Sequence, residues 1–341
     1  MTCHALGVLC ALLTVAAPAL AQQAVWIDPS PHATRFVKVA DSVQLEVLDW
    51  GGSGPPLVLL AGLGDTGHAF DEFAQKLAAR YRVVAVTRRG HGRSSAPSMG
   101  YGFARLAEDV VNVIDSMGLN RPVVVGHSFA GEEMHVLGAR YFAKVAGLVY
   151  IDAAFNRRDE SDNAVYDSIA RTLPPAPRRT PADVASFTSL RSYLERIQGF
   201  AGPEAYLRAR YVVNPDGTVG GMWAPAAPIR QALSAEMQTT YKVYNPERIR
   251  VPALAMYAVP KIATDMMRPW YDPSDSKVQQ SVQTLLPVAR ARFSAHAKWF
   301  QALAERGRIA EFPGAHHLFL SNPSDVLQQI DAFMASLPEK R

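Results

Sequence analysis

A short apolar run, a tight turn of small residues and a periodic stretch follow one another in the middle of the chain. Residues 122–126 read Pro-Val-Val-Val-Gly, which is too short for a helix and typical of a strand buried on both faces of a parallel sheet. Ala130 and Gly131 follow Ser128, and small residues allow a strand and a helix to pass closely. The segment therefore predicts a strand, a turn at Ser128 and a helix over residues 130–141.

Ser128 is a candidate nucleophile because of its place on this turn. A serine hydroxyl is weakly nucleophilic until a base takes its proton, and a strand-to-helix turn raises the hydroxyl clear of the sheet. The motif that does this is G-x-S-x-G, and here Ala130 replaces the second glycine. The alternative is that Ser128 only caps the helix that follows. The order of strand, turn and helix favours the nucleophile.

The same alternation of apolar runs and periodic stretches recurs along the chain. The runs predict eight strands, at residues 34–39, 43–49, 56–61, 81–87, 122–126, 145–152, 252–259 and 308–312. The periodic stretches predict helices at residues 70–80, 103–117, 130–141 and 324–337, and a long one near residues 276–305 that we expect to be interrupted at Pro287. This order predicts an α/β protein with an eight-stranded, mostly parallel sheet flanked by helices.

The alternation stops over residues 155–250, where prolines and aromatic side chains are frequent. We expect this segment to form a mainly helical cap, inserted after the sixth strand into a core of residues 22–154 and 251–341. Aromatic side chains on the inner face of such a cap would suit a largely apolar ligand. The same side chains can instead form a small core within the cap.

The N-terminal residues have the pattern of a targeting signal. Residues 5–20 are apolar, and a small-residue pattern follows, which predicts a signal peptide over residues 1–21 that is cleaved after Ala21. We therefore expect a periplasmic or secreted protein. Both cysteines, Cys3 and Cys10, lie inside this signal. No other apolar run has the length of a membrane span, so we expect no integral membrane segment after cleavage.

The charge of the chain also limits its partners. The formal net charge is +4 over 341 residues, and the arginines are scattered along the sequence. A nucleic-acid partner requires a basic patch or track, which this distribution does not form. We expect a small-molecule ligand and no nucleic-acid partner, and the sequence does not predict an oligomeric state.

Four segments give the chain a resemblance to a known fold superfamily. They follow the third, fourth, fifth and last predicted strands, at residues 60–64, 89–94, 126–131 and 313–320. In this order the set resembles the α/β-hydrolase fold superfamily, over essentially all of the mature sequence apart from the cap. The resemblance implies a serine hydrolase of the esterase type with no cofactor.

The resemblance also assigns an oxyanion hole. Acyl transfer needs two backbone N–H donors, one from the residue after the nucleophile and one from the loop after the third strand. Here these are the N–H groups of Phe129 and Leu63. Relatives often have His-Gly in this loop where this chain has Ala61 and Gly62, so the groups that support the loop must differ.

The general base is expected in the loop after the last strand, because hydrolases of this fold order the triad as serine, acid, histidine. His316 and His317 both qualify. Counting back from the Leu-Phe-Leu segment favours His316 by resemblance to relatives, whereas counting forward from Gly314 favours His317, and we prefer His316. Two adjacent histidines can also bind a metal. We expect no metal here, because neighbouring side chains on an extended loop point apart and no carboxylate cluster accompanies them.

The acid has two candidates. Asp152 ends the sixth predicted strand, where some relatives place their acid, and Asp265 follows the seventh strand after a gap of six residues. An aspartate that ends a buried strand can instead cap the next segment. The acid must reach the ring of His316, which favours Asp152 over Asp265.

The loop after the third strand also matches a dinucleotide-binding motif. Residues 62–67 read G-x-G-x-x-G, and Arg88 and Arg89 stand where an arginine would hold the 2′-phosphate of NADP. Two strands precede the strand that this motif requires to be first. An NADP-dependent oxidoreductase would also leave Ser128 and the late histidine pair unexplained.

Together, these observations predict an exported serine hydrolase that cleaves a carboxylic ester or lactone through Ser128, His316 and an aspartate. A ligand-binding protein of the same fold with little or no turnover is the main alternative. Dehalogenases and epoxide hydrolases of the fold carry an aspartate where this chain has Ser128, so neither is expected.

Overall fold

The structure is a computed structural model that describes residues 26–157, 161–223, 227–243 and 246–338, with no account of the side chains of residues 161–164 and 241–243. Its centre is an eight-stranded sheet with the strand order β1-β2-β4-β3-β5-β6-β9-β10. The strands are β1 (Ala33–Ala40), β2 (Val43–Gly51), β3 (Pro56–Leu60), β4 (Arg82–Val86), β5 (Val123–His127), β6 (Gly147–Ile151), β9 (Ala253–Ala258) and β10 (Gly307–Phe312).

The directions of the strands agree with the predicted sheet. β2 pairs antiparallel with both of its neighbours, β1 and β4, whereas all other pairs in this sheet are parallel. All five residues of β5 are buried, as are all five of β6. Strands covered on both faces read as continuous apolar runs, which is why the sequence located them. The predicted eight-stranded, mostly parallel sheet is confirmed.

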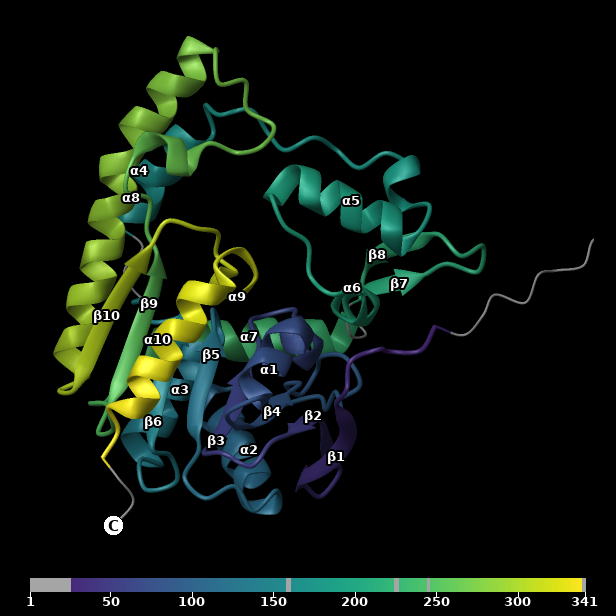
Figure 1. Ribbon diagram of the computed structural model, residues 1–341, viewed down its shortest axis with the longest axis vertical. Coiled ribbons are helices and arrows are strands. Elements are labelled where there is room, and N and C mark those ends of the chain that lie inside the picture. Colours follow the sequence, from purple (N-terminus) through teal and green to yellow (C-terminus); the bar gives the residue numbers. More distant parts are fainter. Residues whose placement is uncertain (1–25, 158–160, 224–226, 244–245, 339–341) are drawn as a thin grey trace, which may run out of the picture.

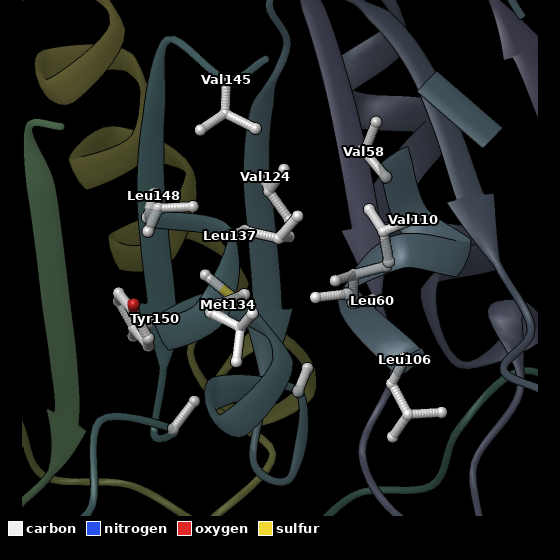
Figure 2. Packing of buried hydrophobic residues seen from close by; sticks show 14 of the residues in the cluster. Val58, Leu60, Leu106, Val110, Val124, Met134, Leu137, Val145, Leu148 and Tyr150 are labelled. Atoms are coloured by element: carbon white, nitrogen blue, oxygen red, sulfur yellow. The ribbon is translucent and has the colours of Figure 1, made fainter. Parts of the chain in front are cut away.

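Helices cover both faces of the sheet (Figure 1). They include α1 (Asp71–Ala78), α2 (Phe103–Ser116), α3 (Ala130–Arg140), α8 (Ser276–Leu303) and α10 (Pro323–Ala335). Alternate residues of a strand point to opposite faces, so one apolar core joins Val58 and Leu60 of β3 to α2, α3 and α8. A second core joins Leu57 and Leu59 to α1 and α10. Figure 2 shows the first core, with Leu137 beside Val124.

A long insertion separates β6 from β9. It contains α4 (Ser161–Ala170), η2 (Ala182–Val184), α5 (Phe187–Gln198), α6 (Glu204–Arg210), the antiparallel pair β7 (Tyr211–Val213) and β8 (Val219–Met222), and α7 (Ala227–Val243). In Figure 1, α4 lies beside α8, while α5, α6 and the β7–β8 hairpin lie on the other side of the molecule. The sequence did not predict the hairpin.

The helix α8 differs from its prediction. It runs without interruption over 28 residues and includes Pro287. The proline ring lies on an exposed part of the helix, while Leu285 and Ala289 on either side are buried. Burial of these neighbours keeps the segment helical although a proline cannot donate its hydrogen bond. The predicted interruption is therefore wrong.

Two predictions concern membranes and export. The signal peptide predicted over residues 1–21 lies outside the described residues. Within the described ranges, no helix combines the length and the apolar character that crossing a bilayer would require.

Candidate active site

Ser128 lies on the turn between β5 and α3, and its backbone has a φ of 52°. This left-handed conformation is strained for a residue other than glycine. The small neighbours have a steric reason: a Cβ at Gly131 would meet the carbonyl oxygen of Ala153, and one at Gly126 would meet the Met134 sulfur. Ala130 fits at its position because residue 126 is glycine. A Cβ at Gly126 would lie 2.9 Å from the Cβ of Ala130.

The structure brings Ser128, His316 and Asp152 together in a chain of hydrogen bonds. Ser128 Oγ lies 2.8 Å from His316 Nε2, and His316 Nδ1 lies 2.6 Å from Asp152 Oδ2. Asp152 is buried at the end of β6, and its other oxygen accepts a hydrogen bond of 3.0 Å from the Ala258 amide. The three residues come from loops after β5, β6 and β10, which end at one edge of the sheet.

The alternative residues lie elsewhere. His317 points away from Ser128, and its Nε2 lies 3.3 Å from Asp65 Oδ2. The carboxylate of Asp265 accepts hydrogen bonds from the amides of Lys261 and Ile262, at 2.7 and 3.0 Å. Asp265 lines the same cavity as Ser128 but makes no hydrogen bond to either of these histidines within the described ranges.

The predicted oxyanion-hole residues flank the serine. Leu63 and Phe129 line the cavity together with Ser128. In the described part of the chain, neither of their amides has a hydrogen-bond acceptor. Two unpaired amides beside a nucleophile are the donors that a tetrahedral oxyanion requires.

Arg88 supports the loop in place of the histidine that relatives often carry there. Its guanidinium donates to the carbonyl oxygens of Ala61 and Gly62, at 2.9 and 3.3 Å. Glu133 of α3 balances the charge of Arg88 through a buried ion pair, with one contact of 2.9 Å. Because two carbonyls of the loop are held by one buried group, the loop has a fixed orientation. This role of Arg88 was not predicted from the sequence.

His91 holds the other side of the same loop. The Gly64 amide donates to His91 Nε2 at 3.1 Å, and His91 Nδ1 donates to the Arg89 carbonyl at 3.0 Å. These two bonds require a neutral imidazole. Burial lowers the pKa of His91 to about 4, helped by the positive charge of Arg88, so the ring stays neutral near pH 7.

Behind the histidine pair lies a second buried polar group, centred on Asp65. Its carboxylate accepts from Tyr206 at 2.8 Å, contacts His317 at 3.3 Å and pairs with Arg210 at 3.1 Å. Burial alone would raise the pKa of Asp65, but the hydrogen bond from His317 and the charge of Arg210 outweigh it and hold the pKa well below its usual range. Tyr206 and Arg210 belong to α6, so this group ties the insertion to the loop after β3 that carries Leu63 and Asp65.

His127, next to Ser128 in the chain, positions the backbone of His316. Its Nε2 donates to the His316 carbonyl at 3.0 Å, and its ring lies 4.6 Å from the His316 ring, measured between centroids. Burial lowers the pKa of His127 well below its ordinary value, and the neighbouring histidines add to the effect. Gly62 must be glycine here, because a Cβ would lie 2.9 Å from His127 Nδ1.

The serine opens onto a cavity of about 1120 Å³. Its walls combine aromatic side chains, among them Phe155, Tyr166 and Phe293, with arginines at positions 157, 268 and 292. Arg157 pairs with the buried Glu132 at 3.0 Å, whereas Arg292 lies over the ring of Tyr166, 5.5 Å from its centroid. The cavity is therefore less apolar than the aromatic content of the insertion suggested.

The dinucleotide motif at residues 62–67 does not form a phosphate cradle. The Gly64 amide is bonded to His91, and the Gly67 amide donates to Thr87 Oγ1 at 3.0 Å. Arg88 and Arg89 are both buried in ion pairs, the latter with Asp109 at 2.7 Å. The groups that an NADP site would use are thus taken by protein partners.

Comparisons with known proteins agree on the family. Residues 57–329 match the Alpha/beta hydrolase family. The magnesium-chelatase 30 kDa subunit of Rhodobacter capsulatus is 30% identical over 183 residues, which cover 52% of this chain and 63% of that protein. A non-heme haloperoxidase of Rhodococcus erythropolis is 38% identical over 120 residues, 35% of this chain and 43% of the relative.

A third relative also has a solved counterpart. The 2-(acetamidomethylene)succinate hydrolase of Mesorhizobium japonicum is 31% identical over 101 residues, 30% of this chain and 36% of that protein. The chain thus spans less than two thirds of the length of these relatives. The crystal structure of E-2-(acetamidomethylene)succinate hydrolase has a TM-score of 0.60 at 19% identity, covering 89% of this chain and 100% of the other.

A serine hydrolase involved in carbazole degradation has a TM-score of 0.54 at 18% identity, over 89% of this chain and 99% of the other. At such low identity these two structures show the fold alone. The family match covers far more than half of the sequence, and the sheet order and the strand-to-helix turn agree with it. This chain therefore belongs to the alpha/beta hydrolase family.

Proposed function

We propose that this protein is a serine hydrolase that cleaves a carboxylic ester or lactone of a small molecule. The observation that carries the proposal is the unbroken hydrogen-bond chain from Ser128 through His316 to Asp152. Beside the serine lie two amides that have no acceptor among the residues that the structure describes. A buried carboxylate, an imidazole and a hydroxyl in this order form the apparatus of acyl transfer.

The geometry supports the following steps. Ser128 Oγ attacks the ester carbonyl while His316 Nε2 accepts its proton, and Asp152 stabilises the imidazolium through the Nδ1–H. The amides of Leu63 and Phe129 donate to the oxyanion of the tetrahedral intermediate. The intermediate collapses to an acyl-Ser128 ester, and the leaving alcohol takes the proton from His316. Water then attacks the acyl group by the same route and releases the acid.

Replacement of the nucleophile tests this proposal. Ser128→Ala should lower kcat for short p-nitrophenyl esters by about 10⁶-fold, because loss of a triad nucleophile removes the acyl-enzyme route. The His317→Asn variant serves as a control, since His317 faces Asp65 and not the serine, and it should retain measurable turnover. Equal turnover by the wild-type protein and Ser128→Ala would refute the proposal.

We further propose that the substrate carries a carboxylate away from its ester group. Among the residues that the structure describes, Arg268 and Arg292 have no carboxylate within ion-pair distance, although both line the cavity. Asp265, the acidic residue nearest to Arg268 in the sequence, already accepts hydrogen bonds from two backbone amides. A guanidinium that faces a cavity and has no carboxylate partner in the protein is suited to a carboxylate of the substrate.

A matched pair of substrates tests this preference. Monomethyl adipate and methyl hexanoate differ by one terminal carboxylate, and kcat/KM should be higher for the adipate ester. Arg292→Gln should lower kcat/KM for the adipate ester by about tenfold or more, since a charged hydrogen bond contributes about 1.5–3 kcal/mol. The same variant should change the value for methyl hexanoate little. Equal losses for both esters would contradict a carboxylate contact.

We also propose export, on the basis of the apolar segment and cleavage pattern in residues 1–21. Expression of the full chain in a Gram-negative host, followed by fractionation and N-terminal sequencing, tests this. A periplasmic product that begins at Gln22 supports export, and an uncleaved cytoplasmic product contradicts it.

A further inference from the structure

Four side chains that could bind a metal gather outside the catalytic cavity. Asp28 and His32 lie in the segment before β1, His68 lies in the short helix η1 (Gly67–Phe70), and Asp71 is the first residue of α1. None of them lines the cavity. We propose that this Asp28–His32–His68–Asp71 group, here called the Asp–His cluster, binds one divalent transition-metal ion of the zinc type.

The spacing of the donor atoms agrees with a tetrahedral metal site. His32 Nε2 lies 3.2 Å from Asp28 Oδ2 and 3.6 Å from Asp71 Oδ1. His68 Nδ1 lies 3.4 Å from Asp28 Oδ2 and 3.1 Å from Asp71 Oδ2. Zinc bonds to nitrogen and oxygen of about 2.0–2.1 Å place neighbouring tetrahedral donors about 3.3 Å apart. One donor atom from each of the four residues lies within 4.8 Å of the other three.

Within the described residues, the hydrogen bonds of the four residues leave the buried Oδ1 of Asp71 without a partner. One ring nitrogen of each histidine faces two carboxylates, but a single N–H can serve only one of them well. The side chains of His32 and Asp71 are 4% and 3% exposed, so water does little to stabilise the carboxylate of Asp71. A divalent cation would neutralise both carboxylates and bind the lone pairs of both imidazoles at once.

The surroundings hold the cluster in shape. The Ser30 amide donates to Asp28 Oδ1 at 2.9 Å, which leaves Oδ2 directed at the two histidines. The indole of Trp50 donates to Ser30 Oγ at 3.2 Å and packs edge-on against His32 at 5.0 Å between ring centroids. Contacts of this kind orient the ligands of metal sites.

The donor set indicates the metal and its role. Two imidazoles and two carboxylates suit zinc, whereas magnesium and calcium prefer six or more oxygen ligands. Four protein ligands close a tetrahedral site, which is typical of a structural ion. The ion would join the segment before β1 to η1 and α1. These two elements directly follow the loop after β3 that carries Leu63.

A second group of metal-binding side chains differs from the Asp–His cluster because its carboxylate already has a positively charged partner. Asp65, His127 and His317 also lie close together. Arg210 already supplies a positive charge to Asp65 at 3.1 Å, and Tyr206 donates to the same carboxylate. This group therefore serves as an internal control for the Asp–His cluster.

Cobalt binding by the whole mature protein tests the site. The protein is treated with a chelator, dialysed and titrated with Co²⁺, which absorbs strongly in the visible range only when four-coordinate. We expect such a spectrum to saturate at one equivalent per chain and to be abolished by Zn²⁺, together with a zinc-dependent rise in the melting temperature. The weak spectrum of octahedral cobalt, or no saturation at one equivalent, would overturn the proposal.

Substitutions locate the ion. His32→Asn and Asp71→Asn should lose both the cobalt spectrum and the stabilisation by zinc, whereas His317→Asn should keep both. Asp28→Asn, at the most exposed ligand, replaces Asp71→Asn if the latter does not fold. Binding that survives in His32→Asn but is lost in His317→Asn would overturn the assignment. Ser128→Ala should bind cobalt as the wild-type protein does, so this test is independent of the proposed hydrolase activity.

Discussion

Ser128 and Asp152 both leave a buried strand in the left-handed region, with φ values of 52° and 45°. Such conformations are costly for residues with a side chain and persist where the surroundings enforce them. Ser128 turns at the end of β5 and Asp152 at the end of the adjacent strand β6. The two sharp turns direct a hydroxyl and a carboxylate to the same edge of the sheet, where His316 connects them.

The roles of the two candidate acids can be separated by mutation. Asp152→Asn should lower kcat by about 10⁴-fold, because an amide cannot hold the imidazole in the required tautomer or stabilise its charge. Asp265→Asn should change kcat by less than about tenfold, since its carboxylate faces the amides of Lys261 and Ile262. Steady-state kinetics with one ester decide between them. A severe loss in Asp265→Asn with a mild loss in Asp152→Asn would reverse the assignment.

Some residues of the candidate site could be predicted from the sequence, and others could not, for a physical reason. The positions of Ser128 and Asp152 at strand ends could be predicted because the end of a buried strand is marked by the end of an apolar run. The choice between His316 and His317 rested on spacing, because adjacent side chains differ only in direction. The contact of Tyr206 with Asp65 joins positions 141 residues apart and left no local pattern.

At the scale of elements, buried strands were predictable and short or exposed ones were not. The sheet strands carry continuous apolar runs because helices cover both faces. The β7 and β8 strands have only three and four residues and are largely exposed, so no alternation marks them. For the helix α8 the sequence-based prediction was wrong in the other direction. The low helix propensity of Pro287 predicted a break, but tertiary packing keeps the helix continuous.

The cost of that proline can be measured. Pro287→Ala should raise the free energy of unfolding by about 2 kcal/mol. A helix-interior proline costs about 3 kcal/mol relative to alanine, and the more flexible unfolded chain of the variant returns about 1 kcal/mol. Gln283→Ala, an exposed substitution one turn earlier, should change stability by less than about 0.5 kcal/mol. Urea denaturation compares the two. No gain in Pro287→Ala would show that the helix accommodates the ring without strain.

At the scale of the whole molecule, the buried histidines make stability depend on pH. Burial lowers the pKa of both His91 and His135 to about 4, while the unfolded chain titrates near 6.5. Between these values the unfolded state binds protons that the folded state does not. The contribution of these two histidines to the free energy of unfolding therefore falls as the pH decreases from about 6.5 to 4.

His135→Gln tests this dependence. At pH 5 each of the two histidines should reduce the free energy of unfolding by about 2 kcal/mol relative to pH 7.5, from about 1.4 kcal/mol per pH unit. In the variant, the free energy of unfolding should differ between pH 7.5 and pH 5 by about 2 kcal/mol less than in the wild-type protein, whatever its stability at pH 7.5. Urea denaturation at both pH values measures it. An unchanged difference would show that His135 is not kept neutral by burial.

The proposed activity depends on one nucleophile near the middle of the chain, Ser128. The most direct measurement is reaction of the mature protein with a fluorophosphonate probe, followed by mass spectrometry of the modified peptide. We predict a single adduct on Ser128, and none in the Ser128→Ala variant, because only a serine activated by His316 reacts readily with such a probe. An unmodified wild-type protein, or an adduct on another residue, would contradict the proposed role of Ser128 as nucleophile.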